Sequence, residues 1–463
     1  MKLSETYKYM LSVLDKAENG PVVEEKDWDQ KYIHQAIKEL IKKYDIKWDS
    51  ETMVPSDDGL ADRLFEAGME LARETGVYCL ETKRQMKWTQ DELDWILSTA
   101  PDEETIGLDE DSVTIRHRIP DEVSPIVTVG GPYGTPVPEE LFVPIMASYA
   151  QERVLDYIDN ATLSTTHGRP IKAGSPWEAV GCWQEAQLSF EVLKRVGRPG
   201  MPIGCAEDSP SAIGELATCT YGGFRITDWH HGSFISELKV AYSELTKAMH
   251  YQHTGAFAHN FYNTIYGGYA GGADGLAVAS VAGVILMKAT LNGTTFNPGP
   301  SHAHLSCSTF PPMIPALSLS FQAISRNSKL LTSSFPRPVA GPVTKELLYE
   351  AAAMAVATVP AGCSILEGIQ SAAGRIEGHV TGLEAKFLAQ VGRAVVGMTR
   401  AEADPLVRKL TPLYAEKQKL GVAMAGKHFA EAYNVETLQP TSEWRDMYEE
   451  VCQEMEVLLG KSL

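Results

Sequence analysis

Two carboxylates and a hydroxyl follow a short apolar run that contains a glycine. The segment 197–209 reads GRPGMPIGCAEDS, comes after a long amphipathic stretch, and closes with Glu207, Asp208 and Ser209. This order is typical of a helix, a short buried strand and a loop that carries polar side chains. In a barrel of alternating strands and helices, loops at the carboxyl ends of strands hold the reacting groups. We therefore treat 197–209 as a candidate catalytic loop, with an ordinary helix-to-strand connection as the alternative.

A second group of residues has the chemistry of a metal site. The segment 301–307 (SHAHLSC) offers the imidazoles of His302 and His304 and the thiol of Cys307, and 228–231 (DWHH) adds two more imidazoles. Zinc accepts such ligands and activates a bound thiolate or alkoxide. The spacing matches no familiar zinc motif. Histidines that are hydrogen-bonded near polar loops are therefore the alternative interpretation.

Aromatic side chains and one arginine have the chemistry of a pocket for an organic cation with an acidic group. Phe261, Tyr262 and Tyr266 stand just before the glycine cluster GGYAGG, and aromatic faces suit a substituted ammonium ion. Arg337 lies between two prolines that fix the local backbone, and a guanidinium suits bidentate binding of a carboxylate. Core packing of the aromatic residues and a solvated surface position for the arginine are the alternatives.

Strand-like and helix-like segments alternate through the middle of the chain. The pattern predicts strands at 112–120, 124–134, 162–166, 328–334 and 361–368, and helices over 139–158, 177–196, 234–251, 274–291, 313–327 and 344–359. Alternation predicts a parallel sheet with crossover helices, and its extent suits a closed (β/α)8 TIM barrel of the α/β class. No GxGxxG or GxxxxGK[ST] signature is present, so an open nucleotide-binding sheet is the weaker alternative.

Helical segments flank this region on both sides. WDQKYIHQAIKELIKKYDI repeats apolar residues at helical spacing, Asp57 and Asp58 open a second helix that stops at Gly76, and Thr89 caps a third. We expect an N-terminal helical extension over 1–111, a catalytic barrel over 112–398 and a C-terminal helical segment over 399–463 that packs on the barrel.

Composition excludes several classes of protein. The 463 residues carry a formal net charge of −19, which disfavours nucleic acid as a partner because phosphate binding needs a basic face. The amino terminus has no signal-peptide character, and no uninterrupted apolar run approaches the ~18 residues of a membrane span. Seven scattered cysteines favour reduced thiols. These features predict a cytoplasmic protein without a membrane segment.

The chain resembles the monomethylamine:corrinoid methyltransferase family over nearly its whole length. The resemblance is carried by WDQKYIHQAIKELIKKYDI, FEAGMELARETGVYC, IVTVGGPYGTPV, GRPGM, IYGGYAGG, VAGP and TGLEAKFLAQVGRA. It implies a (β/α)8 barrel with an N-terminal helical extension and a homo-oligomer, commonly a hexamer. It also implies that a methyl group passes from an amine to the Co(I) corrinoid of a separate small protein, with no cofactor bound tightly by the barrel itself.

Several residues depart from the family pattern. Counting along GRPGMPIG puts the position of the family's pyrrolysine at Gly204, while Glu207 matches a family acid beside that residue's ring. The family's second pocket glutamate falls on Phe261, and its glutamine and tyrosine fall on Phe335 and Arg337. The resemblance thus implies a pyrrolysine-independent enzyme whose carboxylate and amide cradle is replaced, so that monomethylamine is not the expected donor.

The departures favour a donor that is already activated. Co(I) attacks the methyl carbon from behind, so the nitrogen must leave neutral, which a quaternary ammonium does without help. Phe261, Tyr262, Tyr266 and Phe335 are predicted to enclose its methyl groups, and Arg337 to hold a carboxylate of the same molecule. A pyrrolysine-free relative of the trimethylamine enzymes acts on glycine betaine, so by analogy we expect a betaine-like donor.

Two alternatives stay open at the level of sequence. One keeps methyl transfer but places zinc at His302, His304 and Cys307 to activate another donor. The other is a small-molecule-binding barrel without catalysis.

Overall fold

The central part of the chain alternates strands and helices. The computed structural model describes residues 4–204, 206 and 209–463. The strands of the main sheet are β5 (Val127–Gly130), β7 (Tyr157–Ile158), β11 (His230–Phe234), β13 (Ala258–Tyr262), β15 (Thr295–Asn297), β17 (Leu331–Ser334) and β18 (Ile365–Glu367). The helices between and after them are α6 (Glu139–Ala150), α7 (Pro176–Arg195), α8 (Ile213–Thr218), α9 (Tyr242–Thr254), α10 (Ala273–Leu291), α11 (Ile314–Asn327), α12 (Lys345–Thr358) and α13 (Gly382–Ala394).

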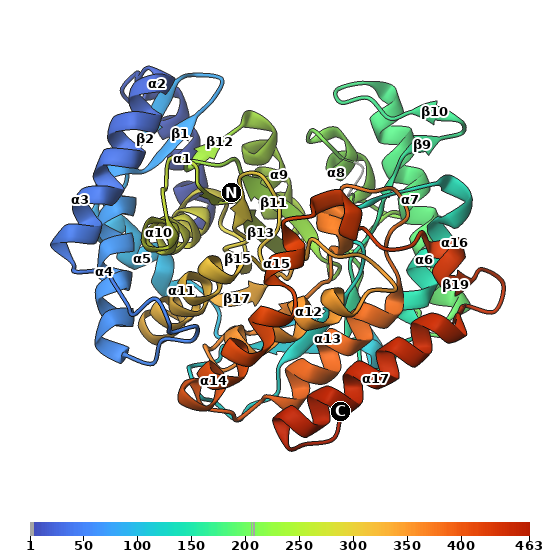
Figure 1. The fold of residues 1–463 in the computed structure, drawn as a ribbon. Helices are drawn as coiled ribbons and strands as arrows, with labels where there is room; N and C mark the ends of the chain where they lie inside the picture. The colour runs from blue at the N-terminus through green and yellow to red at the C-terminus, as the bar shows by residue number, and fades with distance from the viewer. Residues whose placement is uncertain (1–3, 205, 207–208) are drawn as a thin grey trace.

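The strands close into a barrel. The main sheet has the order β11-β13-β15-β17-β18-β5-β7, and all its neighbours are parallel. Parallel bridges from Ile158 to Ile203 and from Gly204 to Trp229 insert the segment 201–204 between β7 and the start of β11. This short strand joins the two ends of the sheet and completes a ring of eight. Figure 1 shows part of this ring, with β11, β13, β15 and β17 in succession. The predicted (β/α)8 barrel is confirmed.

Helix α10 is apolar around nearly its whole circumference, and neighbouring elements cover it on all sides. The barrel strand β13 lies on one side of it and α4 (Asp58–Thr75) on the other, with Gly68 of α4 packed directly on Val281. By length and composition α10 could cross a membrane, but 94% of its apolar window is buried within the fold. Burial of this kind is what a core helix of a large domain requires.

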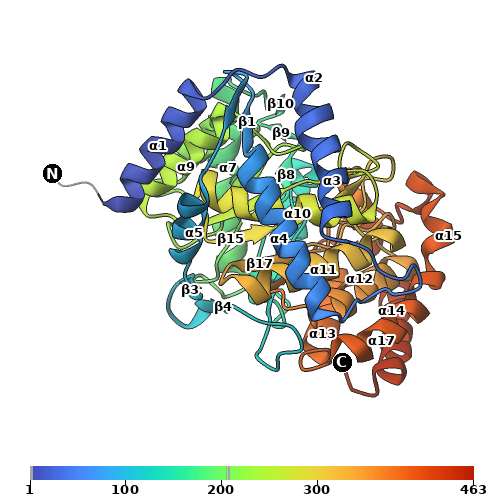
Figure 2. The same ribbon diagram turned by 90° about the vertical axis from the view of Figure 1, so that its left-hand side faces the viewer.

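The N-terminal extension lies along α10 and α11 (Figure 2). Its helices are α1 (Glu5–Asn19), α2 (Glu25–Asp27), the π-helical segment η1 (Trp28–Gln35), α3 (Ala36–Lys43), α4 and α5 (Gln90–Ser98). The three helices predicted in this region are confirmed. Thr89 forms a capping box with Glu92, and Asp57 accepts a hydrogen bond from the N–H of Gly59 at the start of α4.

Short strands tie the extension to the barrel. The strands are β1 (Val77–Cys79), β2 (Arg84–Met86), β3 (Glu103–Ile106), β4 (Val113–Arg116) and β12 (Lys239–Val240). β1 pairs in parallel with β12, which lies between β11 and α9. The strand predicted over 112–120 exists as β4, but it forms a hairpin with β3 outside the main sheet. The predicted domain limit at residue 111 falls inside this hairpin; the domain limits stay predictions.

Two predicted helices were too long: one covered the barrel strand β7, and the other covered β12, which lies outside the main sheet. The helix predicted over 139–158 ends at Ala150, and β7 follows it. The helix predicted over 234–251 begins only at Tyr242, after β11 and β12. The short strands at 162–166 lie outside the main sheet. Strands of two to five residues between helices leave little period-2 signal, so the helical pattern was extended over them.

The C-terminal segment packs on the barrel helices α12 and α13 (Figure 1). It contains α14 (Arg400–Leu410), η5 (Thr411–Leu413), α15 (Ala415–Gln418), η6 (Gly421–Met424), α16 (Phe429–Ala432) and α17 (Ser442–Leu459). The remaining short elements are η2 (Asp109–Asp111), β6 (Pro136–Val137), β8 (Thr162–Leu163), β9 (Thr165–Thr166), β10 (Arg169–Pro170), β14 (Ile265–Tyr266), β16 (Ser301–His302), η3 (Pro311–Met313), η4 (Ser371–Gly374), β19 (Tyr433–Asn434) and β20 (Gln439–Pro440).

Candidate active site

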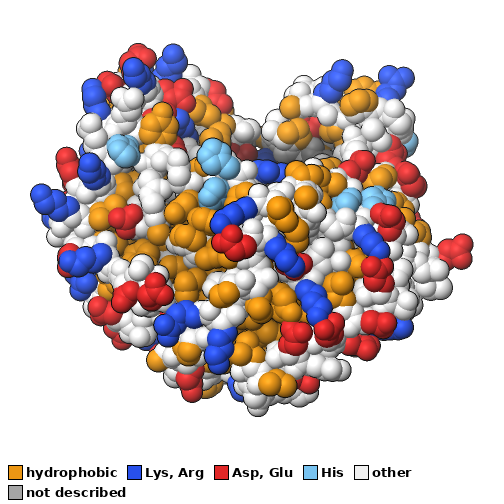
Figure 3. Space-filling model, in the orientation of Figure 1, with side chains coloured by type: hydrophobic (Ala, Val, Ile, Leu, Met, Phe, Trp, Pro, Cys, Tyr) orange, Lys and Arg blue, Asp and Glu red, His pale blue; other side chains and the backbone are white. Residues whose placement is uncertain are grey.

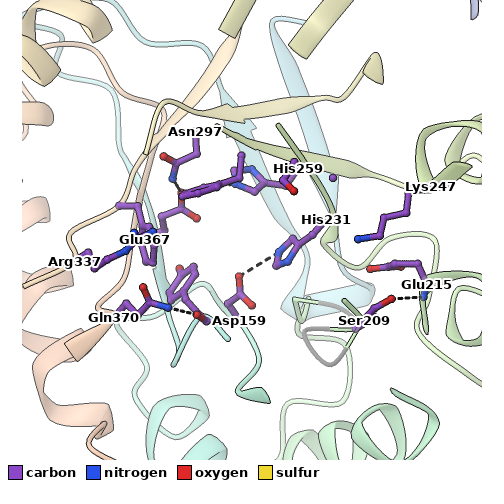
Figure 4. Close-up of a pocket in the computed structure, with 16 residues that line it drawn as sticks. Asp159, Ser209, Glu215, His231, Lys247, His259, Asn297, Arg337, Glu367 and Gln370 are labelled. Carbon is purple, nitrogen blue, oxygen red and sulfur yellow. Dashed lines mark hydrogen bonds and ion pairs between the residues drawn. The ribbon is translucent and has the colours of Figure 1, made fainter. Parts of the chain in front are cut away.

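A cavity of about 270 Å³ lies at the carboxyl ends of the barrel strands. Its walls come from most of the ring: Tyr133 after β5, Asp159 after β7, His231 in β11, Phe261 in β13, Asn297 in β15, Phe335 and Arg337 after β17, and Glu367 in β18 (Figure 4). Figure 3 shows a hollow in the molecular surface between the N-terminal elements and the β9–β10 side. Sites for drug-sized ligands occupy roughly 300–1,000 Å³, so this cavity suits a small molecule.

Among the described residues that line the cavity, two side chains are cationic: Lys247, whose Nζ lies 3.2 Å from Oε1 of Glu244, and Arg337. The guanidinium carbon of Arg337 lies 5.8 Å from the ring centroid of Phe261 and 5.4 Å from that of Phe335, so both rings support the cation. Burial lowers the pKa of Arg337 to about 10, which leaves it charged at neutral pH. Its Nε atom is buried and has no hydrogen-bond partner among the described residues. A partly buried cation in this state is suited to bind an anionic group of a ligand.

The loop that carries Arg337 is held from both sides. The backbone N–H of Arg337 donates to Oγ of Ser308 at 2.8 Å, and the same hydroxyl donates to the carbonyl of Phe335 at 3.0 Å. Glu350 of α12 accepts the N–H groups of Val339 and Ala340 at 3.0 and 3.1 Å. These bonds satisfy the backbone of a loop without regular structure and fix the position of the guanidinium.

Asp159 and His231 face each other across the strand that contains Gly204. Nε2 of His231 lies 3.3 Å from Oδ2 of Asp159, and the Asp159 side chain is only 1% exposed. Asp159 follows β7, and His231 belongs to β11. Between these two strands lies the short strand 201–204, which contains Gly204. A β-carbon on Gly204 would lie 2.4 Å from Oδ1 and 2.6 Å from Cγ of Asp159. Because glycine has no side chain, the carboxylate of Asp159 can occupy this space.

A second acid lies deeper in the cavity. Glu367 accepts a hydrogen bond from Nδ2 of Asn297, and its Oε1 lies 3.8 Å from Nε2 of His259. Burial, together with the nearby Asp159, raises the pKa of Glu367 to about 8, although hydrogen bonds from Ser333 and Asn297 oppose this rise. Burial also holds the pKa of His259 well below its usual range, so this ring is neutral. The cavity thus combines a cationic Arg337 with acidic groups on other strands.

We expect Glu367→Gln to flatten the dependence of stability on pH. Because the folded-state pKa is about 8 and the ordinary value is 4.5, the folded protein holds a proton that the unfolded chain loses in this interval. The free energy of unfolding therefore falls as pH rises from 4.5 to 8, by up to about 5 kcal/mol from this group. Glutamine still accepts from Asn297 but cannot ionise. Melting temperatures of both proteins between pH 5.5 and 8 measure the difference.

The control for this experiment is Glu449→Gln on the exposed face of α17. Glu350 and Glu384 are also buried, and burial raises the pKa of each to about 7, so some pH dependence stays in every variant. Parallel curves for Glu367→Gln and the unaltered protein would contradict the assignment of a proton to Glu367.

The structure places four of the seven predicted site residues at or beside the cavity. Phe261, Phe335 and Arg337 line it, and Gly204 lies beside Asp159. Glu207 lies outside the described residues.

Tyr262 and Tyr266 do not line the cavity, which corrects their predicted role. Tyr262 follows Phe261 in β13, so its ring points outward; it packs on Gly283 of α10 and is 1% exposed. Tyr266 lies in β14 and stacks on His302, with 5.5 Å between ring centroids. The enclosure of an ammonium ion by four aromatic rings, as predicted, is therefore not present.

The residues proposed for zinc do not converge. Nδ1 of His302 accepts the N–H groups of His304 and Leu305, both at 3.2 Å, so this nitrogen is used locally. Cys307 is buried, and burial raises the pKa of its thiol to about 12. Across the described ranges, no three His, Cys, Asp or Glu side chains form a group that could hold a metal ion. The zinc hypothesis is not supported at these three residues.

Sequence reasoning missed the acidic side of the cavity. Asp159 directly follows a segment that was predicted as helix up to residue 158, and Glu367 and Asn297 end short strands that carried no motif. The replacement of the family's cradle at Phe261, Phe335 and Arg337 stays a prediction, and other strands supply carboxylate and amide groups to the cavity. The available signal was positional: each residue ends or follows a strand of the barrel.

This chain matches known proteins over almost its whole length. A family model described as monomethylamine methyltransferase MtmB matches residues 9–459. Monomethylamine methyltransferase MtmB of Methanosarcina mazei and MtmB2 of Methanosarcina acetivorans are each 33% identical over 445 residues, which is 96% of this chain and 96% of theirs. The crystal structure of Methanosarcina barkeri MtmB and that of a hydroxylamine MtmB complex each superpose with a TM-score of 0.94 at 30% identity, covering 97% of this chain and 98% of theirs.

Proposed function

The chain belongs to the monomethylamine methyltransferase family, and we propose that it transfers a methyl group from a methylated ammonium compound bearing a carboxylate to the Co(I) corrinoid of a partner protein. The observation that carries the proposal is Arg337, a partly buried cation in the cavity wall with no carboxylate partner among the described residues. An unpaired charge in such a place is costly unless a ligand pairs with it.

The cavity is suited to a zwitterion. Arg337 lies at one side of the labelled residues in Figure 4, the pair of Asp159 and His231 lies in the middle, and Lys247 and Glu215 lie at the other side. A carboxylate on the ligand would pair with the guanidinium, and an ammonium group would lie nearer the acidic groups. A ligand anchored at both ends is held in one orientation, which is the main contribution a protein can make to a direct methyl transfer.

The charge on nitrogen is required by the chemistry. The corrinoid would supply a nucleophilic Co(I) that takes the methyl carbon, while the bonding electron pair stays on nitrogen. A neutral amine would have to leave as an amide anion, whereas an ammonium leaves as a neutral amine. The residues of this chain need only bind the charged form and direct its methyl group toward the hollow above the cavity.

The position of Gly204 supports a reaction without pyrrolysine. By the family resemblance this is the position of the long side chain that handles the amine, and here Asp159 fills the space beside it. Pyrrolysine independence is part of the proposal. The homo-oligomeric state and the cytoplasmic location stay predictions.

Monomethylamine is the second candidate donor, because the relatives carry that substrate in their names and because the cavity has retained acidic and amide groups. It would leave Arg337 without a counter-ion.

The test is methyl transfer with purified protein and a Co(I) corrinoid acceptor, either a corrinoid protein or free Co(I) cobalamin, followed by the change in its absorption spectrum. Donors are N-methyl compounds with a carboxylate, the same compounds with an alcohol in its place, and methylamine. We expect transfer from the carboxylated donors only. Faster transfer from methylamine would refute the carboxylate requirement, and binding without transfer would favour the non-catalytic barrel.

A further inference from the structure

We infer that the nitrogen of the donor keeps at least one N–H bond, so that the substrate is a protonated secondary or tertiary N-methylammonium carboxylate rather than a quaternary one. This inference rests on the proposed function and narrows its substrate class. It follows from two features of the cavity: the contacts that its aromatic rings already make, and the positions of its hydrogen-bond acceptors.

The four aromatic rings predicted to form the cage are committed elsewhere, and Tyr133 supplies the one further phenyl ring of the described lining, 4.6 Å from that of Phe335. A quaternary ammonium has no N–H and is recognised by aromatic faces. Phe261 and Phe335 already face the guanidinium of Arg337, at 5.8 and 5.4 Å from their centroids. Tyr262 packs on α10 and Tyr266 stacks on His302, so neither reaches the cavity. The four rings predicted to enclose the methyl groups therefore form no cage for a second cation, and the single ring of Tyr133 cannot enclose one by itself.

Hydrogen-bond acceptors are present instead. Asp159 lines the cavity with its side chain 1% exposed. Asn297 is also 1% exposed, and its Oδ1 has no hydrogen-bond partner among the described residues. N-methyl groups that displaced water from these oxygens would offer no donor in return, whereas an N–H bond does. The walls are thus matched to an ammonium group that can donate.

The placement of Asp159 depends on the local fold. The residue follows β7, and the next strand around the ring ends in Gly204, which has no side chain to occupy the same space. His231, on the strand beyond, lies 3.3 Å from the carboxylate. The carboxylate is thus fixed between two strands beside the cavity, as a hydrogen-bond acceptor must be to select one form of a ligand.

The step balances without any added proton. In a protonated amine the carbon–nitrogen bond breaks with its electron pair staying on nitrogen, the methyl carbon bonds to the reduced cobalt, and the N–H proton leaves with the neutral amine. An acceptor beside the N–H favours the charged form of the ligand, since hydrogen bonding to a charged group stabilises it. Asp159 would then keep the donor in the only protonation state that can react.

The test compares three donors that share one carboxylate and carry one, two or three N-methyl groups. We expect kcat/KM for the singly or doubly methylated compound to exceed that of the quaternary compound at least about tenfold, or about 1.4 kcal/mol. Asp159→Asn should lower kcat/KM about 10-fold to 100-fold for the N–H donors and less than threefold for the quaternary donor, because the amide is a weaker acceptor for a cation.

The matched control is Asp156→Asn, at the opposite end of β7, where the carboxylate pairs with Arg393 at 3.1 Å away from the cavity. It should leave the order of the donors unchanged. If Asp159→Asn does not fold, the increase in melting temperature of the unaltered protein with each donor gives the same order. A preference for the quaternary donor in either measurement overturns the inference while leaving methyl transfer intact. Transfer from none of the three overturns the proposed function, and the inference with it.

Discussion

Arg337→Met should reduce kcat/KM for a carboxylated methyl donor by about 100-fold to 1,000-fold, or about 3–4 kcal/mol. Methionine keeps an apolar stem that packs between Phe261 and Phe335 but has no charge. The guanidinium is the only positive group that the cavity places against these two rings in the described part of the chain. Steady-state rates with a carboxylated donor and its alcohol analogue measure the effect.

The loss should be confined to the carboxylated donor, because only that donor pairs with the guanidinium. Arg337→Lys keeps the charge but loses the planar, bidentate geometry, so its rate should lie between those of the unaltered protein and Arg337→Met. Arg375→Ala is the control, since Arg375 is exposed and bonds to Ser306 outside the cavity. Equal losses with both donors would show that Arg337 supports the fold rather than the substrate.

The stability of Arg337→Met should not fall together with its activity. Arg337 is partly buried, and its Nε has no hydrogen-bond partner among the described residues, so removing the charge relieves a desolvation cost. We therefore expect Arg337→Met to melt at the same temperature or higher in the absence of ligand. Binding residues commonly carry this trade between stability and activity.

The cationic side of the site could be predicted from sequence because it rests on local features. Arg337 lies between prolines, and Phe261, Phe335 and Arg337 occupy positions that the family resemblance marks. The same local reasoning failed for Tyr262, because two aromatic residues in succession do not reveal which one points into a barrel. Only the ring order of the strands shows that Phe261 faces inward and Tyr262 faces α10.

The acidic side could not be predicted because it depends on contacts between distant segments. Asp159 follows a strand of two residues, and its carboxylate fills space left by Gly204, 45 positions later. No spacing within either segment records this fit. The N-terminal extension was easier to predict, because the capping box of Thr89 and Glu92 encodes a helix start within four residues.

Gly204→Ala should lower both stability and activity. The added β-carbon would lie 2.4 Å from Oδ1, 2.6 Å from Cγ and 2.9 Å from Cα of Asp159, so both the side chain and its backbone must move. Overpacking of this kind costs about 1–3 kcal/mol. Displacement of the carboxylate from His231 should also reduce methyl transfer about 100-fold or more, since a shift of about 1 Å at a reacting site has effects of that size. Thermal unfolding and the transfer assay measure the two losses.

The control is Gly59→Ala, in the exposed first turn of α4, where a β-carbon would meet nothing closer than 3.3 Å. It should be neutral or slightly stabilising, because alanine favours a helix over glycine. An unchanged melting temperature and rate for Gly204→Ala would contradict the close fit between Gly204 and Asp159.

A double-mutant cycle separates the space that Asp159 fills from the chemistry that it performs. Asp159→Gly combined with Gly204→Ala removes the Oδ1 and Cγ contacts, so we expect the double variant to regain most of the stability that Gly204→Ala loses. Methyl transfer from an N–H donor should stay low, because the acceptor is absent. Recovery of both properties would assign Asp159 a packing role alone. If the double variant regains stability but not methyl transfer, the carboxylate of Asp159 itself acts on the donor. Gly204 then serves the reaction because it leaves room for that carboxylate.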